Sequence, residues 1–197
     1  MTRGDVANRI STLARDISAD LIVMSTHGRA GVARLIRKNE AEQVVRLTGT
    51  PLLSIRPTQE WKSRQTQFKR LLVSLDGSRE SEQVLRYARA LAKRFESKIL
   101  LLAVPEADSE IESMNAYLEQ VAQALRGRGL NAQAMVTGSG PARTIVKVSE
   151  SEQADLIMMA THGRGGAHRS IPVGSVADRV IQSTERPAFA VPCRTHQ

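Results

Sequence analysis

The sequence predicts an α/β protein with an open, doubly wound parallel sheet of five strands and a partial second copy of that unit at the amino terminus. Two observations support this prediction. Short apolar runs alternate with stretches of helical periodicity through most of the chain. In addition, A-D-L-I-V-M-S-T-H-G-R-A-G begins at Ala19, and A-D-L-I-M-M-A-T-H-G-R-G-G begins at Ala154. Internal similarity of this kind indicates a duplicated structural unit.

Residues 1–57 predict the order helix, strand, helix, strand. The first strand is a short apolar run, which is typical of a strand buried on both faces. Two parallel strands leave an open sheet edge, and so few residues form only a marginal core. We therefore expect this segment to be stabilised by packing against the rest of the chain, against a second chain, or against residues outside this sequence. The expected elements are Asp5–Ala14, Leu21–Met24, Glu40–Leu47 and Leu52–Ile55.

Residues 58–67 are polar and lack an apolar period, which predicts a linker. Residues 68–193 then predict five strands and four helices in strict alternation. The first strand leads through a turn at Asp76 to a helix that begins after Ser78, a favourable cap, and ends near Phe95. The strands are Leu71–Leu75, Ile99–Val104, Ala132–Val136, Leu156–Met159 and Ala188–Val191, and the later helices are Ile111–Leu125, Pro141–Val148 and Val176–Gln182.

Composition narrows the classes of function. The net charge is +8, but the basic residues are scattered and aromatic residues make up only 3%, which argues against specific nucleic-acid binding. No apolar run is long enough to span a bilayer, and no secretory signal is evident at the first residues, so we expect a cytoplasmic protein that does not bind membranes. The single cysteine, Cys193, suits a reducing compartment.

A candidate ligand site lies past the carboxyl ends of the strands in residues 68–193. In open α/β sheets this is the edge where ligands bind. Asp76 follows the first strand, the glycine-bearing segment 160–166 follows the fourth, and Gly174-Ser175 opens the last helix. Glycine lets backbone amides approach a ligand, and a helix start attracts anions, so this pattern predicts a phosphate site without a Walker lysine. Asp76 is equally open to a plain role as a turn and helix-start residue.

These residues resemble the universal stress protein family. The resemblance covers residues 68–193 in full and relates residues 1–57 to the second half of the same domain. The ATP-binding branch carries G-x-x-G, nine residues and then G-[ST]; this chain has Ala160-Thr161-His162-Gly163, ten residues and then Gly174-Ser175. Ala160 replaces the first glycine, and the longer loop contains Pro172. In the first segment Lys38-Asn39 replaces G-[ST] and no strand-one aspartate precedes it.

The resemblance implies an adenine nucleotide α-hydrolase-like fold and binding of ATP, alone or with magnesium, in the second repeat only. It further implies a regulatory module in the stress response. No catalytic residue and no protein metal ligand is expected. The implied nucleotide-binding residues are Asp76, Ala103, Met159, Ala160, His162, Gly163, Gly174, Ser175, Val176 and Ala177.

Two alternatives stay open. The chain could be a structural or interaction protein that binds no nucleotide, because the first segment has itself lost the glycine motif. It could also hydrolyse ATP slowly or phosphorylate itself, although no general base is evident. The resemblance also implies pairing through the fifth strand of each unit, either between Leu52–Ile55 and Ala188–Val191 within one chain or between two chains of a homodimer.

Overall fold

The structure is a computed structural model, and it describes residues 6–25, 43–44, 47–56, 67–161 and 175–193. Seven strands form one sheet in the order β1-β2-β7-β6-β3-β4-β5. All neighbouring strands are parallel except β2 and β7, which are antiparallel. The strands are β1 (Ile22–Ser25), β2 (Leu52–Ile55), β3 (Arg70–Ser74), β4 (Lys98–Ala103), β5 (Asn131–Val136), β6 (Leu156–Ala160) and β7 (Ala188–Val191).

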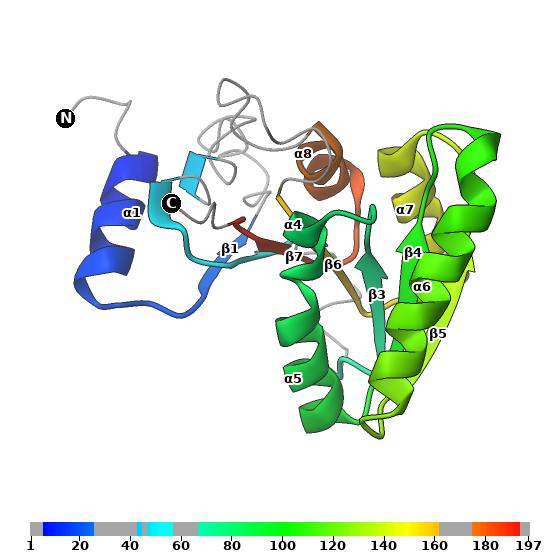
Figure 1. The fold of residues 1–197 in the computed structure, drawn as a ribbon. Coiled ribbons are helices and arrows are strands. Elements are labelled where there is room, and N and C mark those ends of the chain that lie inside the picture. Colours follow the sequence, from blue (N-terminus) through cyan, green and yellow to red (C-terminus); the bar gives the residue numbers. More distant parts are fainter. Residues whose placement is uncertain (1–5, 26–42, 45–46, 57–66, 162–174, 194–197) are drawn as a thin grey trace.

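Helices cover both faces of the five strands from β3 to β7, so the predicted α/β class is confirmed (Figure 1). One face packs against α5 and α6 through a core that includes Val73, Ala88 and Leu118. The other face packs against α7 and α8 through a core that includes Leu72 and Ile145. The helices are α1 (Val6–Asp16), α4 (Arg79–Glu82), α5 (Leu85–Phe95), α6 (Ile111–Arg126), α7 (Pro141–Ser151) and α8 (Ser175–Ser183), with a 3₁₀ turn, η1 (Asp108–Glu110).

The helix predicted after Ser78 is divided into α4 and α5. The Val84 amide donates to the Ser81 carbonyl at 3.3 Å, a three-residue step, and the helix restarts when Ala88 donates to the Val84 carbonyl at 3.1 Å. The Ser81 hydroxyl donates to the Ser78 carbonyl at 2.8 Å and so competes for an acceptor of the first turn. Apolar periodicity continues through this break, which is why the pattern predicted one helix.

The predicted pairing of the two fifth strands within one chain is confirmed. Leu52 lies opposite Ala190, and Leu53 lies opposite Phe189, in an antiparallel ladder. Both β2 and β7 therefore have a neighbour on each side, and these two edges are not open to a second copy of the chain. The predicted linker falls almost wholly outside the described residues, so the proposed domain boundaries remain a prediction.

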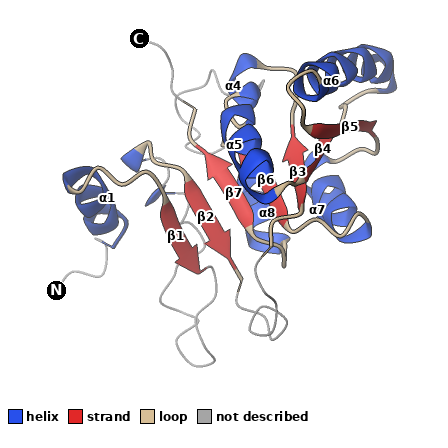
Figure 2. Cartoon of the chain, turned by 90° about the horizontal axis from the view of Figure 1, so that it is seen from below, coloured by secondary structure: helices blue, strands red, loops and turns tan. Residues whose placement is uncertain are grey.

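One expectation for the first segment was wrong. The strand β1 is not buried on both faces: Ile22 is buried, but Val23 is 58% exposed. Figure 2 shows the reason, since β1 lies at the end of the sheet, with β2 on one side and no described strand on the other. The helix α1 packs its buried Ala7 and Ala14 against Ile22 on one face, and no described element covers the other face of β1.

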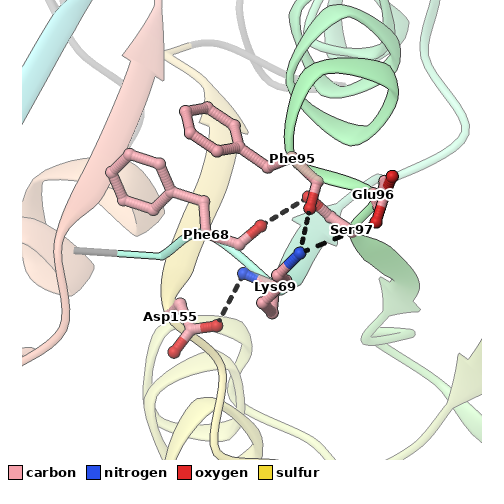
Figure 3. Close-up of polar contacts among 6 residues, drawn as sticks. All are labelled: Phe68, Lys69, Phe95, Glu96, Ser97 and Asp155. Carbon is pink, nitrogen blue, oxygen red and sulfur yellow. Dashed lines mark hydrogen bonds and ion pairs between the residues drawn. The ribbon is translucent and has the colours of Figure 1, made fainter. Parts of the chain in front are cut away.

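A carboxylate joins the amino ends of β3 and β6. Figure 3 shows Asp155, just before β6, accepting at Oδ2 from the Lys69 amide, and the Arg70 amide donates to the same oxygen; both bonds are 2.9 Å. The Lys69 ammonium donates to the Phe95 carbonyl at 2.8 Å, and the Ser97 hydroxyl donates to the Phe68 carbonyl. Asp155 therefore fixes where β3 begins relative to β6.

We expect Asp155→Ala to lower the free energy of unfolding by about 1–2 kcal/mol, because two strand amides lose a charged acceptor. The repeat supplies a matched control, since Asp20 occupies the equivalent position and is exposed. Asp20→Ala should change stability by less than about 0.5 kcal/mol, as is usual for surface substitutions. Urea unfolding of the two variants measures the difference, and equal losses would contradict the role assigned to Asp155.

Candidate functional site

The candidate site lies where the order of the strands reverses. The strand β3 sits between β4 and β6, and the chain runs outward from β3 to β4 and β5 before it returns to β6 on the other side. The register places Ser74 opposite Leu102 of β4 and Val73 opposite Met158 of β6. The carboxyl ends of these three strands therefore meet at one edge, which is the ligand-binding position of doubly wound sheets.

Asp76 follows β3 at this edge and is half-buried. Its Oδ1 accepts from the Ser78 amide at 3.0 Å and from the Ser78 hydroxyl at 2.6 Å. Gly77 between them has φ of +83°, a left-handed conformation that favours glycine. The Ser78 hydroxyl in turn accepts from the Ser81 amide at 3.1 Å and caps α4. The carboxylate thus has the turn and helix-start role that was one of its two predicted roles.

The other described residues of the predicted site lie beside Asp76 along the same edge. Ala103 ends β4 and is 1% exposed within the core that packs on α5 and α6. Met159 is 3% exposed within the core on the opposite face. Ala160 is half-buried at the end of β6. The Thr161 amide then donates to the Val191 carbonyl at 2.8 Å, which holds the first residue after β6 against the neighbouring strand.

The helix α8 begins at Ser175, the residue predicted to open it. Val176 is half-buried, and Ala177 is buried in the same core as Met159 and Leu72. The first amides of an α-helix have no partner within the helix, so its start is a favourable place for an anion. Of the predicted site residues, His162, Gly163 and Gly174 lie outside the described residues, as does the side chain of Ser175.

Sequence reasoning did not single out Tyr117, which lies on α6 near the candidate site. Its hydroxyl donates to Glu82 Oε1 at 3.0 Å, and Glu82 belongs to α4, next to the Asp76 turn. Burial raises the pKa of Tyr117 well above its usual value of 10.0, and the negative charges of Glu82 and Asp76 raise the pKa further. Only the apolar period of α6 was visible in the sequence, and a tyrosine on its margin gives no signal of this contact.

The raised pKa of Tyr117 predicts a loss of stability in alkali. Above its ordinary pKa of 10.0 the unfolded chain releases the phenolic proton while the folded chain retains it, so the free energy of unfolding falls as pH rises from there. We expect Tyr117→Phe to remove this part of the pH dependence and to cost less than about 1 kcal/mol at pH 7. Urea unfolding of the unmodified chain and of the Tyr117→Phe variant between neutral pH and pH 11 tests this prediction. If the free energy of unfolding of the two proteins fell equally steeply with pH above pH 10, the prediction would be contradicted.

Two kinds of site are not found among the described residues. No group of three or more His, Cys, Asp or Glu side chains in this part of the chain could hold a metal ion. Within the same described ranges, no helix is both long and apolar enough to cross a membrane.

Comparison with known sequences relates the chain to one family. The profile of the universal stress protein family matches residues 1–56 and 67–192. Universal stress protein Sll1654 of Synechocystis is 32% identical over 136 residues, covering 64% of this chain and 86% of that protein. Universal stress protein MJ0531 of Methanocaldococcus jannaschii is 29% identical over 140 residues, covering 63% and 82%. Universal stress protein Rv2005c of Mycobacterium tuberculosis is 26% identical over 185 residues, covering 87% and 61%.

Solved structures share the fold. A universal stress protein of Archaeoglobus fulgidus matches with a TM-score of 0.75 at 19% identity, covering 95% of this chain and 65% of that one. A universal stress protein in complex with cAMP matches with a TM-score of 0.55 at 17% identity, covering 64% and 97%. A shorter universal stress protein from Archaeoglobus fulgidus in complex with dAMP matches with a TM-score of 0.52 at 20% identity, covering 64% and 98%.

The coverage separates two groups of relatives. The proteins from Synechocystis and M. jannaschii are covered for most of their length, whereas this chain spans 65% of the first Archaeoglobus structure and 61% of the mycobacterial protein. The profile match extends over most of the chain, on both sides of residues 57–66. The chain therefore belongs to the universal stress protein family.

Proposed function

We propose that residues 68–193 bind an adenine nucleotide, with ATP as the ligand, at the edge between β3 and β6. The observation that supports this most is the arrangement of one half-buried carboxylate, Asp76, and one helix start, α8, on either side of the reversal in strand order. Structures of family members with the same fold contain cAMP or dAMP. An adenine base, a ribose or deoxyribose ring and at least one phosphate are common to ATP, cAMP and dAMP.

Each residue has an expected part in this proposal. Asp76 would accept a hydrogen bond from a ribose hydroxyl or the adenine amine, and the small side chain of Ala103 would leave space for the base. The amides of Gly163, Gly174 and Ser175, with the Ser175 hydroxyl, would solvate the phosphates at the start of α8. The remaining predicted residues would line the nucleotide, namely Met159, Ala160, His162, Val176 and Ala177.

Asp76 must divide its hydrogen bonds between the turn and the ligand. Its Oδ1 already accepts from Ser78, which orients the carboxylate and holds the first turn of α4. A carboxylate has about four lone-pair sites on its two oxygens, so it can serve the turn and a ribose hydroxyl together. Occupation of Oδ1 therefore orients the group without preventing the proposed contact.

The consequence of binding would be regulatory rather than catalytic. A ligand shifts the equilibrium between two conformations by as much as its affinities for them differ. A nucleotide that contacts both Asp76 and the start of α8 would favour the conformation in which the two elements are correctly spaced. A partner that distinguishes the conformations would then sense the nucleotide. No residue of this chain is assigned a catalytic role.

The second candidate function is that of an interaction protein without nucleotide. Two observations favour it: the Asp76 carboxylate is explained by the α4 turn alone, and Ala103 and Met159 are explained as core residues. In this case the complete domain would serve as a scaffold and the open end of the sheet as a contact surface.

One experiment separates the two functions. Protein purified without added nucleotide is denatured with acid, and the released material is examined for adenine absorbance and mass. The apo protein is then heated with ATP, ADP, cAMP and GTP. Released adenine nucleotide, or a rise in melting temperature with adenine nucleotides and none with GTP, supports the proposal. Absence of both supports the interaction protein instead.

A further inference from the structure

The two copies of the repeat differ sharply in how far the same positions are buried. Through the first strand of each copy, positions that are 135 residues apart are equivalent, as Ala19 and Ala154 show; in the second strand the separation is 136, because the intervening loop of the second copy is one residue longer. Leu21 and Val23 in the first copy are 41% and 58% exposed. Their counterparts Leu156 and Met158 are 1% and 0% exposed and lie in one core. All four side chains are apolar, so the first copy leaves uncovered a surface that the second copy buries.

The second copy shows which elements provide the missing cover. The strand β6, equivalent to β1, pairs with β3 along the edge that is open in β1. Leu156 and Met158 share one core with Leu71 of β3 and with Val84 and Ala88 at the start and middle of the helix that follows. A single strand and the helix after it therefore bury the face that Leu21 and Val23 expose.

The same surface continues onto β2. Leu53 and Ile55 are half-buried, whereas their counterparts Phe189 and Val191 are 7% and 0% exposed. Leu53 lies opposite Phe189 across the β2–β7 ladder and packs against the core beneath α5. The uncovered face of the first copy is thus continuous with the helix-covered face of the second.

A polar residue marks the same edge. Asp155 binds the amides of Lys69 and Arg70 and so holds the first residues of the parallel strand β3 beside β6. The repeat retains this carboxylate as Asp20, before β1. Asp20 is exposed, and it has no hydrogen-bond partner within the part of the chain that the structure describes. At this position a carboxylate is suited to accept hydrogen bonds from the first backbone amides of a strand that pairs in parallel with β1.

We infer that the open edge of β1 binds a strand–helix segment of a partner polypeptide, in the way that residues 68–95 bind to β6. The partner strand enters parallel to β1, its first two amides bind Asp20, and its helix covers Leu21, Val23 and Leu53. This is strand addition to an exposed edge, in which main-chain bonds supply affinity and side-chain pockets supply selectivity. The partner therefore has an apolar strand with polar residues at its start, followed by an amphipathic helix.

A second copy of this chain fits the surface less well. A two-fold axis perpendicular to the sheet would pair β1 with its own copy in the antiparallel direction. Both α1 helices would then lie on the same face, where α1 already packs, and Val23 and Leu53 would remain uncovered. The antiparallel neighbour would also present the end of a strand, rather than its first amides, to Asp20.

A peptide with the sequence of residues 67–96 provides the probe, because this segment contains the strand and helix that cover β6. The peptide carries a fluorophore at its carboxyl end and is titrated into the full chain, with binding followed by fluorescence anisotropy. We expect saturable binding that Asp20→Ala weakens by about tenfold, since two charge-assisted hydrogen bonds are lost. Val23→Glu, a change at an exposed position, should abolish binding, and Asp16→Ala, at the exposed end of α1, should leave it unchanged.

Methylation of the backbone amide of Arg70 in the peptide distinguishes a specific hydrogen bond to the Asp20 carboxylate from nonspecific hydrophobic binding. The methylated peptide should bind the unmodified chain about tenfold more weakly, and it should show a clearly smaller loss on the Asp20→Ala variant. Absence of saturable binding, or equal binding to the Asp20→Ala variant, overturns the inference. Sedimentation that shows a dimer in the absence of peptide, which Val23→Glu dissociates, overturns it in favour of a second copy of the chain.

Discussion

Replacing Asp76 with alanine is expected to weaken ATP binding by at least about tenfold, the effect of losing one good hydrogen bond to a charged acceptor. The same change removes the acceptor for the Ser78 amide and hydroxyl, so the free energy of unfolding should also fall by about 1 kcal/mol. Calorimetric titration of ATP and urea unfolding measure the two effects independently.

The control for this experiment is Ser78→Ala. This variant loses the hydroxyl that donates to Asp76 and caps α4, but it retains the carboxylate. We expect a similar loss of stability, about 1 kcal/mol, with ATP affinity retained within about threefold. Equal loss of affinity in both variants would mean that the turn matters rather than the carboxylate. Unchanged affinity in both would remove Asp76 from the nucleotide site.

Leu156→Ala is expected to lower the free energy of unfolding by about 2–5 kcal/mol, whereas Leu21→Ala at the equivalent repeat position should lower it by less than about 1 kcal/mol. Leu156 is 1% exposed between β3 and the helices above it, so truncation removes contacts and leaves a cavity. Leu21 is 41% exposed, and truncation there removes little that is packed.

Comparing the two leucine variants tests whether the two copies are buried to different extents, because the substitution and the surrounding sequence are the same in both. Urea unfolding of both variants provides the comparison. A loss from Leu21→Ala as large as that from Leu156→Ala would show that the first copy is covered in solution. The surface that we assign to a partner segment would then not exist in the isolated chain.

The bounds of the strands could be predicted closely because buried strands appear in the sequence as short apolar runs. The run at Ala188–Val191 coincides with β7, and Leu52–Ile55 coincides with β2. The family resemblance also implied that these two strands could pair within the chain, which the antiparallel ladder confirms. Apolar runs and duplication are local or periodic features, and a sequence displays them without knowledge of the fold.

The features that the sequence did not reveal depend on neighbours in space. The run from Leu21 to Met24 resembles its buried counterpart, yet Val23 is exposed because none of the described strands and helices lies beside β1 as β3 and α5 lie beside β6. At the division between α4 and α5 the Val84 amide donates to the carbonyl three residues back, and apolar periodicity does not register such a local change of hydrogen bonding. The contact of Tyr117 with Glu82 joins two helices that are 35 positions apart at these residues.

The sequence allowed the candidate residues to be placed along one edge of the sheet, while their part in binding stays a prediction. Asp76 follows β3, Ala103 and Ala160 end β4 and β6, and the topology brings these strand ends together at the reversal of strand order. Sequence reasoning left two roles open for Asp76, and the structure supplies the bond to Ser78 that belongs to one of them. The part of His162, Gly163 and Gly174 in binding remains a prediction.

A crystal structure of the chain grown with millimolar ATP tests the central claim most directly. We expect the adenosine group beside Asp76 at the end of β3 and the phosphates at the first amides of α8. Electron density for the nucleotide between these two elements, with Asp76 in contact with the ribose or the base, is the predicted result. A well-ordered edge without nucleotide, or a nucleotide bound elsewhere on the chain, would contradict it.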